Sequence, residues 1–183
     1  SEDYVRETEV MQTLSGNKNI VGIDDCYVAP KESGIGYNIF IKMEYLTPLS
    51  EWIENNRLTE DAVLKIGADI SSALEACREH NIIHRDIKPD NILINKLGNA
   101  RIIDFGLSSS YDSIYTGVIG GSEGFTAPEI LHPSVTEPVD ELMTEGNNVP
   151  GGYKASSDIY SLGLIIQLLL GNKYQKKKKK CTM

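Results

Sequence analysis

The chain has 183 residues, enough for one domain with a hydrophobic core but too few for two full-sized domains. Hydrophobic residues make up 40% and charged residues 24%, which is ordinary for a globular protein and excludes disordered and fibrous classes. There are 18 basic and 26 acidic residues, and residues 176–180 alone supply five of the lysines. The rest of the chain is therefore strongly acidic and would repel phosphate backbones, so we predict no nucleic-acid partner.

The three cysteines and the apolar segments restrict the cellular setting. The cysteines form no CxxC pair, so the sequence predicts neither a disulfide framework nor a zinc site, which fits a reducing compartment. The polar start at Ser1, Glu2 and Asp3 does not match a signal peptide. The longest apolar run, residues 162–170, contains Gln167 and is too short to cross a bilayer. We therefore predict a cytoplasmic protein without a membrane span in this chain.

The N-terminal part contains one helical and two strand-like patterns. Apolar residues at three- and four-residue spacings predict a helix over residues 3–14. Stretches rich in Ile, Val, Tyr and Phe predict strands over 20–28 and 37–45, and the 30–36 segment between them has the composition of a hairpin loop. A short helix is expected at 49–56.

The clearest helix begins after Thr59, a residue type that caps helix N-termini, and extends to Glu79. Its apolar positions recur on one face, which predicts that these residues are buried: Val63, Ile66, Gly67, Ile70, Ala73, Leu74 and Cys77.

Beyond this helix the pattern changes to short apolar runs separated by polar loops. Strands are expected at 82–83, 92–94 and 102–103. An irregular insertion is expected at 131–152, and a last helix at 157–170 is apolar on nearly all sides, which predicts that it is buried. The mixture of helices and short strands predicts an α+β fold.

Polar side chains gather directly after these strands. Residues 84–91 read His-Arg-Asp-Ile-Lys-Pro-Asp-Asn, and Asp104 begins an Asp-Phe-Gly sequence after another apolar run. Hard divalent cations prefer oxygen ligands, and Asn91 and Asp104 suit that task. Asp86 would then be free to face a hydroxyl group, and Lys88 could neutralise charge on a moving phosphoryl group. This combination of residues fits phosphoryl transfer.

Four motifs in this order resemble the eukaryotic-type (Hanks-type) serine/threonine protein kinases, with some likeness to bacterial members. Residues 84–91 match the catalytic loop, 104–106 the DFG motif, 127–129 the APE motif and 158–163 the helix that anchors the catalytic loop. The resemblance implies a two-lobed, kinase-like α+β fold that uses ATP and Mg²⁺.

The resemblance also divides the chain into parts. Residues 1–175 would form a partial kinase domain, in which 1–46 are the remnant of the small lobe and the hinge. Residues 47–175 would be a mainly helical, truncated large lobe. Within this scheme 131–152 is an insertion and 176–183 is a lysine-rich tail.

The resemblance implies a role for individual site residues. Asp86 would accept the proton of the substrate hydroxyl, and Lys88 would contact the γ-phosphate. Asn91 and Asp104 would be the magnesium ligands. The resemblance also implies six nucleotide-binding residues, most of them in the hinge or on the floor of the site: Met43, Glu44, Leu46, Asp90, Leu93 and Ile103.

Other motif residues are expected to support the site rather than to react. The His84 ring would brace the catalytic loop, and Phe105 would pack with Met11 and Ile23. Asp158 would accept hydrogen bonds from backbone amides, because a buried charge needs such partners.

Two segments of the family pattern are missing. A kinase domain opens with a glycine-rich loop and a lysine-bearing strand, whereas this chain starts at the helix that follows, so no lysine precedes Glu7 to pair with it. The chain also stops just after the anchoring helix. We therefore expect a fragment of a longer kinase, inactive as 183 residues alone, and a degenerate relative is the alternative.

Lys88 and Ser122 favour serine and threonine as acceptors, because kinases of that class carry a lysine and a small hydroxyl residue at these positions. The expected function is transfer of the γ-phosphate of ATP to Ser or Thr hydroxyls of a protein substrate. Two other functions stay open: a non-catalytic interaction module that keeps the fold, and a small-molecule phosphotransferase of the aminoglycoside kinase type. The latter class generally lacks the Lys88-Pro89 pair, an APE segment and the Asp158 helix motif.

Overall fold

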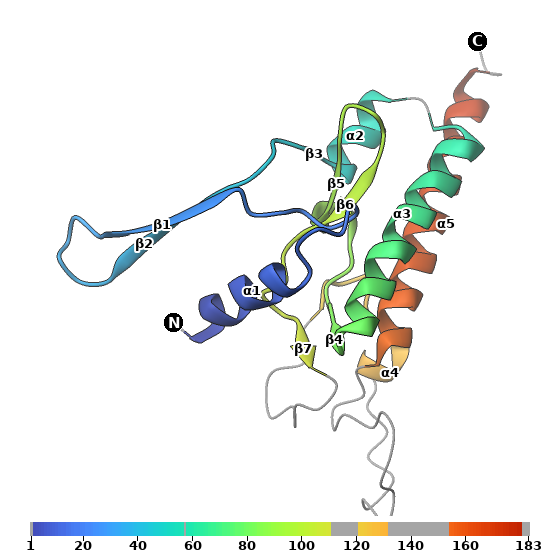
Figure 1. Ribbon diagram of the computed structural model, residues 1–183. Coiled ribbons are helices and arrows are strands. Elements are labelled where there is room, and N and C mark those ends of the chain that lie inside the picture. Colours follow the sequence, from blue (N-terminus) through green and yellow to red (C-terminus); the bar gives the residue numbers. More distant parts are fainter. Residues whose placement is uncertain (1, 57, 111–120, 132–153, 181–183) are drawn as a thin grey trace, which may run out of the picture.

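The computed structural model describes most of the chain, namely residues 2–56, 58–110, 121–131 and 154–180. Helix α1 (Glu2–Thr13) and a β-hairpin of β1 (Asp25–Pro30) and β2 (Tyr37–Lys42) lie on one side, and the hairpin extends away from the rest (Figure 1). The two longest helices, α3 (Glu60–Glu79) and α5 (Ala155–Lys180), run alongside each other on the opposite side. Helix α1 matches its prediction, and the architecture is the predicted mixture of α and β.

The sequence predicts that the first strand begins at Ile20, but strand β1 begins at Asp25. The preceding backbone bonds to a central strand instead. The Val21 amide donates to the Ile102 carbonyl (3.0 Å), and the Ile102 amide donates to the Asn19 carbonyl (2.9 Å). Ile20 and Val21 are almost fully buried there. Burial in the core therefore outweighs the strand propensity that would have lengthened the hairpin.

The hairpin pairs in antiparallel register, with Asp25 opposite Lys42 at its base. The predicted loop is confirmed, since the Lys31 amide donates to the Gly36 carbonyl at 3.0 Å. Strand β2 ends at Lys42, earlier than the predicted Tyr45. The chain then continues without regular structure into the central sheet, and this connector holds the predicted hinge.

The central sheet is antiparallel, in the order β3 (Thr47–Pro48), β5 (Ile92–Ile94) and β6 (Ala100–Ile102). A second pair joins β4 (Ile82–Ile83) to β7 (Ser109–Ser110). The predicted strands at 82–83 and 92–94 are thus confirmed, whereas the third begins earlier than predicted, at Ala100, and ends at Ile102. Most of their buried apolar side chains form one core with the apolar faces of α1, α3 and α5, while Ile83 of β4 belongs to a second cluster with Ala127 and Ile130.

The predicted N-cap and buried face of α3 are both confirmed. The Thr59 hydroxyl oxygen accepts a hydrogen bond from the Ala62 amide at 3.1 Å, and every apolar position predicted for the buried face is buried. A Cβ atom at Gly67 would lie 3.3 Å from Ile166 Cδ1, so glycine lets α3 and α5 approach closely. The short helix α2 (Leu49–Asn55) also agrees with its prediction.

Helix α5 differs from its prediction in length and in burial. It runs through to Lys180, so helical structure continues into the lysines predicted to be a tail. Only part of its apolar surface is buried, because α3 is the main described element that packs against it. Three side chains that the prediction places in the interior are between 38% and 53% exposed: Ile159, Tyr160 and Leu168.

Parts of the predicted domain scheme lie outside the described residues. Of the predicted insertion at 131–152 only Leu131 is described, at the end of α4 (Pro128–Leu131). The lobe boundaries stay predictions. Among the described residues, no helix combines the length and apolar character needed to cross a membrane.

The Thr59 cap generates a stability prediction. Changing Thr59 to Ala should lower the free energy of unfolding by about 1 kcal/mol, because the Ala62 amide loses its acceptor at the start of α3. Urea denaturation monitored by circular dichroism measures this value. Ser71→Ala, an exposed hydroxyl deletion inside the same helix, is the matched control and should not destabilise the protein. Equal effects of the two substitutions would contradict the capping role.

Candidate active site

The catalytic loop, residues 84–91, connects β4 to β5 and is held by α5. The Asp158 carboxylate accepts hydrogen bonds from the backbone amides of His84 (2.8 Å) and Arg85 (2.9 Å). Asp158 is buried, and these two donors offset the cost of burying its charge. Arg85 has a positive φ of 74°, an unfavourable backbone conformation that such contacts can maintain. The anchoring role predicted for Asp158 is confirmed.

His84 braces the loop from inside the core. Its Nε2 lies 3.2 Å from the Ile103 carbonyl oxygen, its Nδ1 lies 3.3 Å from the Asp86 amide, and its ring packs against Phe105. A neutral ring protonated on Nε2 satisfies both hydrogen bonds, whereas an imidazolium could not accept from Asp86. Burial also lowers the pKa of His84, which agrees with the neutral form. The predicted supporting role is confirmed.

Phe105 holds the segment that carries Asp104 in the core. It is fully buried and belongs to the same apolar cluster as Met11, with Ile23 packed against that cluster, as predicted. Asp104 itself is exposed, so the aromatic ring next to it in the chain fixes the segment while the carboxylate stays accessible.

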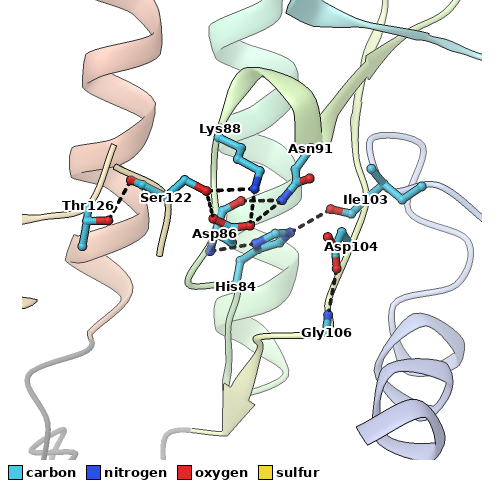
Figure 2. A network of polar contacts seen from close by, with 9 residues as sticks. All are labelled: His84, Asp86, Lys88, Asn91, Ile103, Asp104, Gly106, Ser122 and Thr126. Carbon is cyan, nitrogen blue, oxygen red and sulfur yellow. Dashed lines mark hydrogen bonds and ion pairs between the residues drawn. The ribbon is translucent and has the colours of Figure 1, made fainter. Parts of the chain in front are cut away.

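A polar network surrounds the Asp86 carboxylate (Figure 2). Lys88 Nζ lies 2.9 Å from Oδ2 of Asp86, and the Ser122 hydroxyl donates to Oδ1 at 2.8 Å. The Asn91 side-chain amide donates to Oδ2 and to the Asp86 carbonyl, both at 2.9 Å. Lys88 also donates to Ser122 Oγ at 2.8 Å. The structure thus brings together three of the four predicted catalytic residues with Ser122, whose predicted contact with the loop is confirmed.

These contacts fix the charges of Asp86 and Lys88. Burial by itself would raise the pKa of Asp86, but hydrogen bonds from Lys88, Ser122 and Asn91 and the positive charge of Lys88 outweigh burial and lower it. The hydrogen bond to Asp86 likewise raises the pKa of Lys88. Asp86 is therefore an ionised acceptor with fixed orientation at neutral pH, and Lys88 stays cationic.

Asp104, the fourth predicted catalytic residue, lies opposite this network on the segment after β6 (Figure 2). Its φ of 70° and the hydrogen bond from the Gly106 amide to its Oδ1 (3.2 Å) define its position. Burial raises the pKa of Glu7 on α1, and the negative charge of Asp104 is the second, smaller cause. Two carboxylates that repel each other favour a cation nearby.

The donor set fits magnesium rather than a transition metal. The Asn91 nitrogen is occupied by Asp86, which leaves its Oδ1 for a cation, and Asp104 adds a carboxylate. No group of three or more His, Cys, Asp or Glu side chains forms a metal site within the described ranges. Magnesium does not need such a group, because it keeps several waters and is commonly bound through one or two carboxylates plus substrate phosphates.

Five of the six residues predicted to bind nucleotide lie in the connector or in and next to the central sheet. Met43, Glu44 and Leu46 lie in the connector between β2 and β3, and Leu93 lies in β5, where it pairs with β3 and β6. Ile103 follows β6 directly, and its amide donates to the Asn91 carbonyl at 3.0 Å, which ties it to the catalytic loop.

Asp90 faces another way, because its Oδ1 accepts a hydrogen bond from the Ser50 hydroxyl at the start of α2 (2.7 Å). The sequence reasoning did not single out Ser50. It also missed Arg101, whose Nη1 lies 2.6 Å from Glu44 Oε2. A charged residue between the apolar Ala100 and Ile102 is the signal that could have identified Arg101 as facing away from the core.

Helix α5 also holds the segment that carries Ser122. Ser161 donates to the Phe125 carbonyl at 2.7 Å, and Ser157 donates to Glu129 at 3.0 Å. Gly121 has a φ of 130°, and a Cβ there would lie 2.6 Å from the Thr126 hydroxyl, so this position requires glycine. The placement of Ser122 beside Asp86 therefore depends on α5 and on Gly121.

The neutral state of His84 generates a pH prediction. Its folded pKa lies below its unfolded value, so its contribution to stability is present above about pH 6.5 and is lost as the pH falls through the folded pKa. The free energy of unfolding should be measured at pH 7 and at pH 5. Its decrease between the two should be smaller in His84→Gln than in the wild type, by up to about 1.4 kcal/mol per pH unit. His80→Gln, on the exposed end of α3, is the control and should keep the wild-type dependence. Identical pH slopes for both variants would contradict a neutral buried His84.

Comparison with known proteins identifies the family. The chain matches the protein kinase domain model over residues 1–182. The serine/threonine-protein kinase Pkn1 of Myxococcus xanthus is 33% identical over 169 residues, 86% of this chain and 21% of that protein. The probable serine/threonine-protein kinase PknB of Lactococcus lactis is 32% identical over 175 residues, 92% of this chain and 24% of that protein.

A plant relative shows a similar match. The serine/threonine-protein kinase PEPKR2 of Arabidopsis thaliana is 31% identical over 136 residues, 74% of this chain and 28% of that protein. The chain thus spans between 21% and 28% of the length of these three relatives. The family model covers nearly the whole chain, and its motifs fold into one hydrogen-bonded site. This chain belongs to the protein kinase family.

Proposed function

We propose that the protein containing this chain transfers the γ-phosphoryl group of ATP to Ser and Thr hydroxyls of a protein substrate. The observation that carries the proposal is the Asp86 carboxylate, held by Lys88, Asn91 and Ser122 on three sides. Phosphoryl transfer needs little covalent help from the enzyme and depends on positioning and charge stabilisation. A fixed acceptor next to a fixed cation meets both needs.

Each residue of the network has a proposed task. Asp86 orients the substrate hydroxyl by accepting its hydrogen bond and takes the proton as the hydroxyl oxygen attacks phosphorus. Lys88 lies 2.9 Å from Asp86 and is placed to stabilise negative charge on the transferring group. Magnesium, when bound through Asn91 and Asp104, would neutralise and orient the phosphates of ATP.

We assign the adenine side of the nucleotide site to the connector and the adjoining sheet. Backbone groups of the hinge, between Met43 and Leu46, would bond the base, while Leu93 and Ile103 would line it. Asp90 is the weakest member of this set, because its carboxylate is engaged by Ser50 on α2. A cytoplasmic location stays a prediction from the sequence.

The Ser/Thr preference rests on local geometry as well as on the relatives' names. Lys88 bonds to both Asp86 and Ser122, so the two residues expected of serine/threonine kinases form one unit with the proposed base. This intact unit also favours a catalyst over an interaction module, which would have no need of it.

The decisive test is phosphoryl transfer by the full-length protein that contains this chain. With ATP and magnesium it should phosphorylate a generic protein acceptor and give phosphoserine and phosphothreonine. Asp104→Asn should lower turnover by about 100-fold or more, because a proposed magnesium ligand is lost. Asp61→Asn, an exposed carboxylate on α3, is the matched control and should not change turnover.

Other outcomes of this assay separate the competing functions. Near wild-type turnover of Asp104→Asn would contradict the assignment. ATP binding without transfer would favour the interaction module, and transfer to an aminoglycoside but not to protein would favour the small-molecule phosphotransferase. Mainly phosphotyrosine would overturn the Ser/Thr preference.

The Ser122 hydroxyl should contribute measurably to turnover. Ser122→Ala removes hydrogen bonds to the Asp86 carboxylate and from the Lys88 ammonium, and hydrogen bonds to charged groups contribute about 1.5–3 kcal/mol. We expect kcat to fall about tenfold or more, while Ser122→Thr, which keeps the hydroxyl, should stay closer to wild type. Steady-state kinetics on the full-length protein measures both. Equal losses in the two variants would show that side-chain size, and not the hydroxyl, matters here.

A further inference from the structure

An ion pair joins the predicted hinge to the central sheet. Glu44 lies in the connector between β2 and β3, and its Oε2 is 2.6 Å from Nη1 of Arg101 in β6. The side chains are 48% and 25% exposed, respectively. The two residues are 57 positions apart in the sequence, so this contact exists only in the folded protein. None of the roles assigned above to Glu44 uses its carboxylate.

Arg101 lies on the face of the sheet where the nucleotide is proposed to bind. Its neighbours in β6, Ala100 and Ile102, are fully buried, so alternation along the strand directs Arg101 to the opposite face. Arg101 is directly paired with Leu93 of β5, and paired residues share a face of an antiparallel sheet. Leu93 is proposed to line the nucleotide, which places Arg101 beside the same surface.

The connector has little else to hold it. Within the described ranges, residues 43–46 take part in none of the backbone hydrogen bonds formed outside helices and strands. Tyr45 is 93% exposed and Met43 is only partly buried, so Leu46 is the one buried residue of this segment. The ion pair of Glu44 is therefore the main polar contact between this segment and the sheet, among the residues that the structure describes.

The guanidinium also depends on Glu44. Arg101 Nε is buried and has no hydrogen-bond partner among the described residues. The hydrogen bond from Nη1 to Glu44 is therefore the main polar contact of the guanidinium in this part of the chain. A guanidinium in this partly buried position favours conformations of the connector that keep the carboxylate within reach.

We propose that Arg101 and Glu44 are positioning residues, whose ion pair holds the hinge backbone at a fixed distance from the metal-binding end of β6. Asp104 follows Arg101 by three residues along the same segment. The pair therefore couples the segment proposed to bond adenine to the residue proposed to hold magnesium at the phosphates. This inference rests on the proposed function, because it concerns how ATP is bound.

The expected effect is on nucleotide affinity more than on turnover. Preorganised binding groups lose less conformational freedom when a ligand binds, so a loosened hinge should weaken ATP binding. The Asp86 network contains neither residue of the pair, so the chemical step should change little once ATP is bound. A rise in Kd and KM with a nearly constant kcat is the signature of such a change.

The experiment compares Glu44→Gln, Arg101→Met and the double variant in the full-length protein. Dissociation constants for a fluorescent ATP analogue, KM for ATP, kcat, and hydrogen exchange of the amides at 43–46 are measured for each. Arg101→Lys is the conservative variant, which can still pair with Glu44. Glu75→Gln is the matched control, because it removes an exposed ion pair with Arg78 on α3, away from the site.

We expect Kd and KM to rise about threefold to fivefold in each single variant, the range for a partly exposed ion pair. The double variant should be no worse than the single ones, since both remove the same contact. Exchange at 43–46 should become faster, Arg101→Lys should largely restore both readouts, and the control should match wild type.

Three results would overturn the inference. The first is unchanged affinity and exchange in both single variants. The second is additive losses in the double variant, which would show that the residues act separately. The third is tighter nucleotide binding or faster turnover after the pair is broken, which would make the contact inhibitory. If the wild-type protein fails to bind the analogue, the proposed function itself fails and this inference falls with it, a result distinguished by the wild-type measurement alone.

Discussion

The buried carboxylate of Asp158 is the contact on which the geometry of the site depends. Its two oxygens accept hydrogen bonds from the amides of His84 and Arg85, which are 74 and 73 residues away in the chain, respectively. A carboxylate without such donors would be too costly to bury in an apolar helix. The loop in turn needs the carboxylate, because Arg85 has a left-handed backbone conformation. Asp86 is the next residue, so its direction is set by this anchor.

Helix α5 positions both halves of the site from one short stretch. Asp158 holds the catalytic loop, while Ser157 and Ser161 bond to Glu129 and to the Phe125 carbonyl. These three residues lie within slightly more than one turn, so a single rigid element holds the loop and the segment that carries Ser122. The contact between Ser122 and Asp86 therefore follows from packing on α5 and does not depend on the flexible ends of long side chains.

The sequence predicts the parts of the site that local pattern determines. The Thr59 cap and the buried face of α3 are encoded within a few residues, and the structure confirms them. The spacing of residues 84–91 is equally local, and the catalytic roles read from it stay predictions. Long-range competition defeats the same reasoning at Ile20, where the core sheet takes the backbone from the hairpin, and along α5, where burial depends on which elements cover it. The pairing of Arg101 with Glu44 was also out of reach, because it requires knowledge of strand register.

The charge distribution explains why two aspartates in one site can have different tasks. Asp86 is neutralised by Lys88 and held by Ser122 and Asn91, so both of its oxygens have fixed directions and a cation is already present. Asp104 forms no ion pair with any lysine or arginine in the described part of the chain, is exposed, and repels Glu7. A divalent cation gains most where negative charge is uncompensated. The electrostatics therefore favour the proposed roles, with magnesium at Asp104 and with Asp86 as the acceptor for a hydroxyl proton, the division on which the proposed phosphoryl transfer rests.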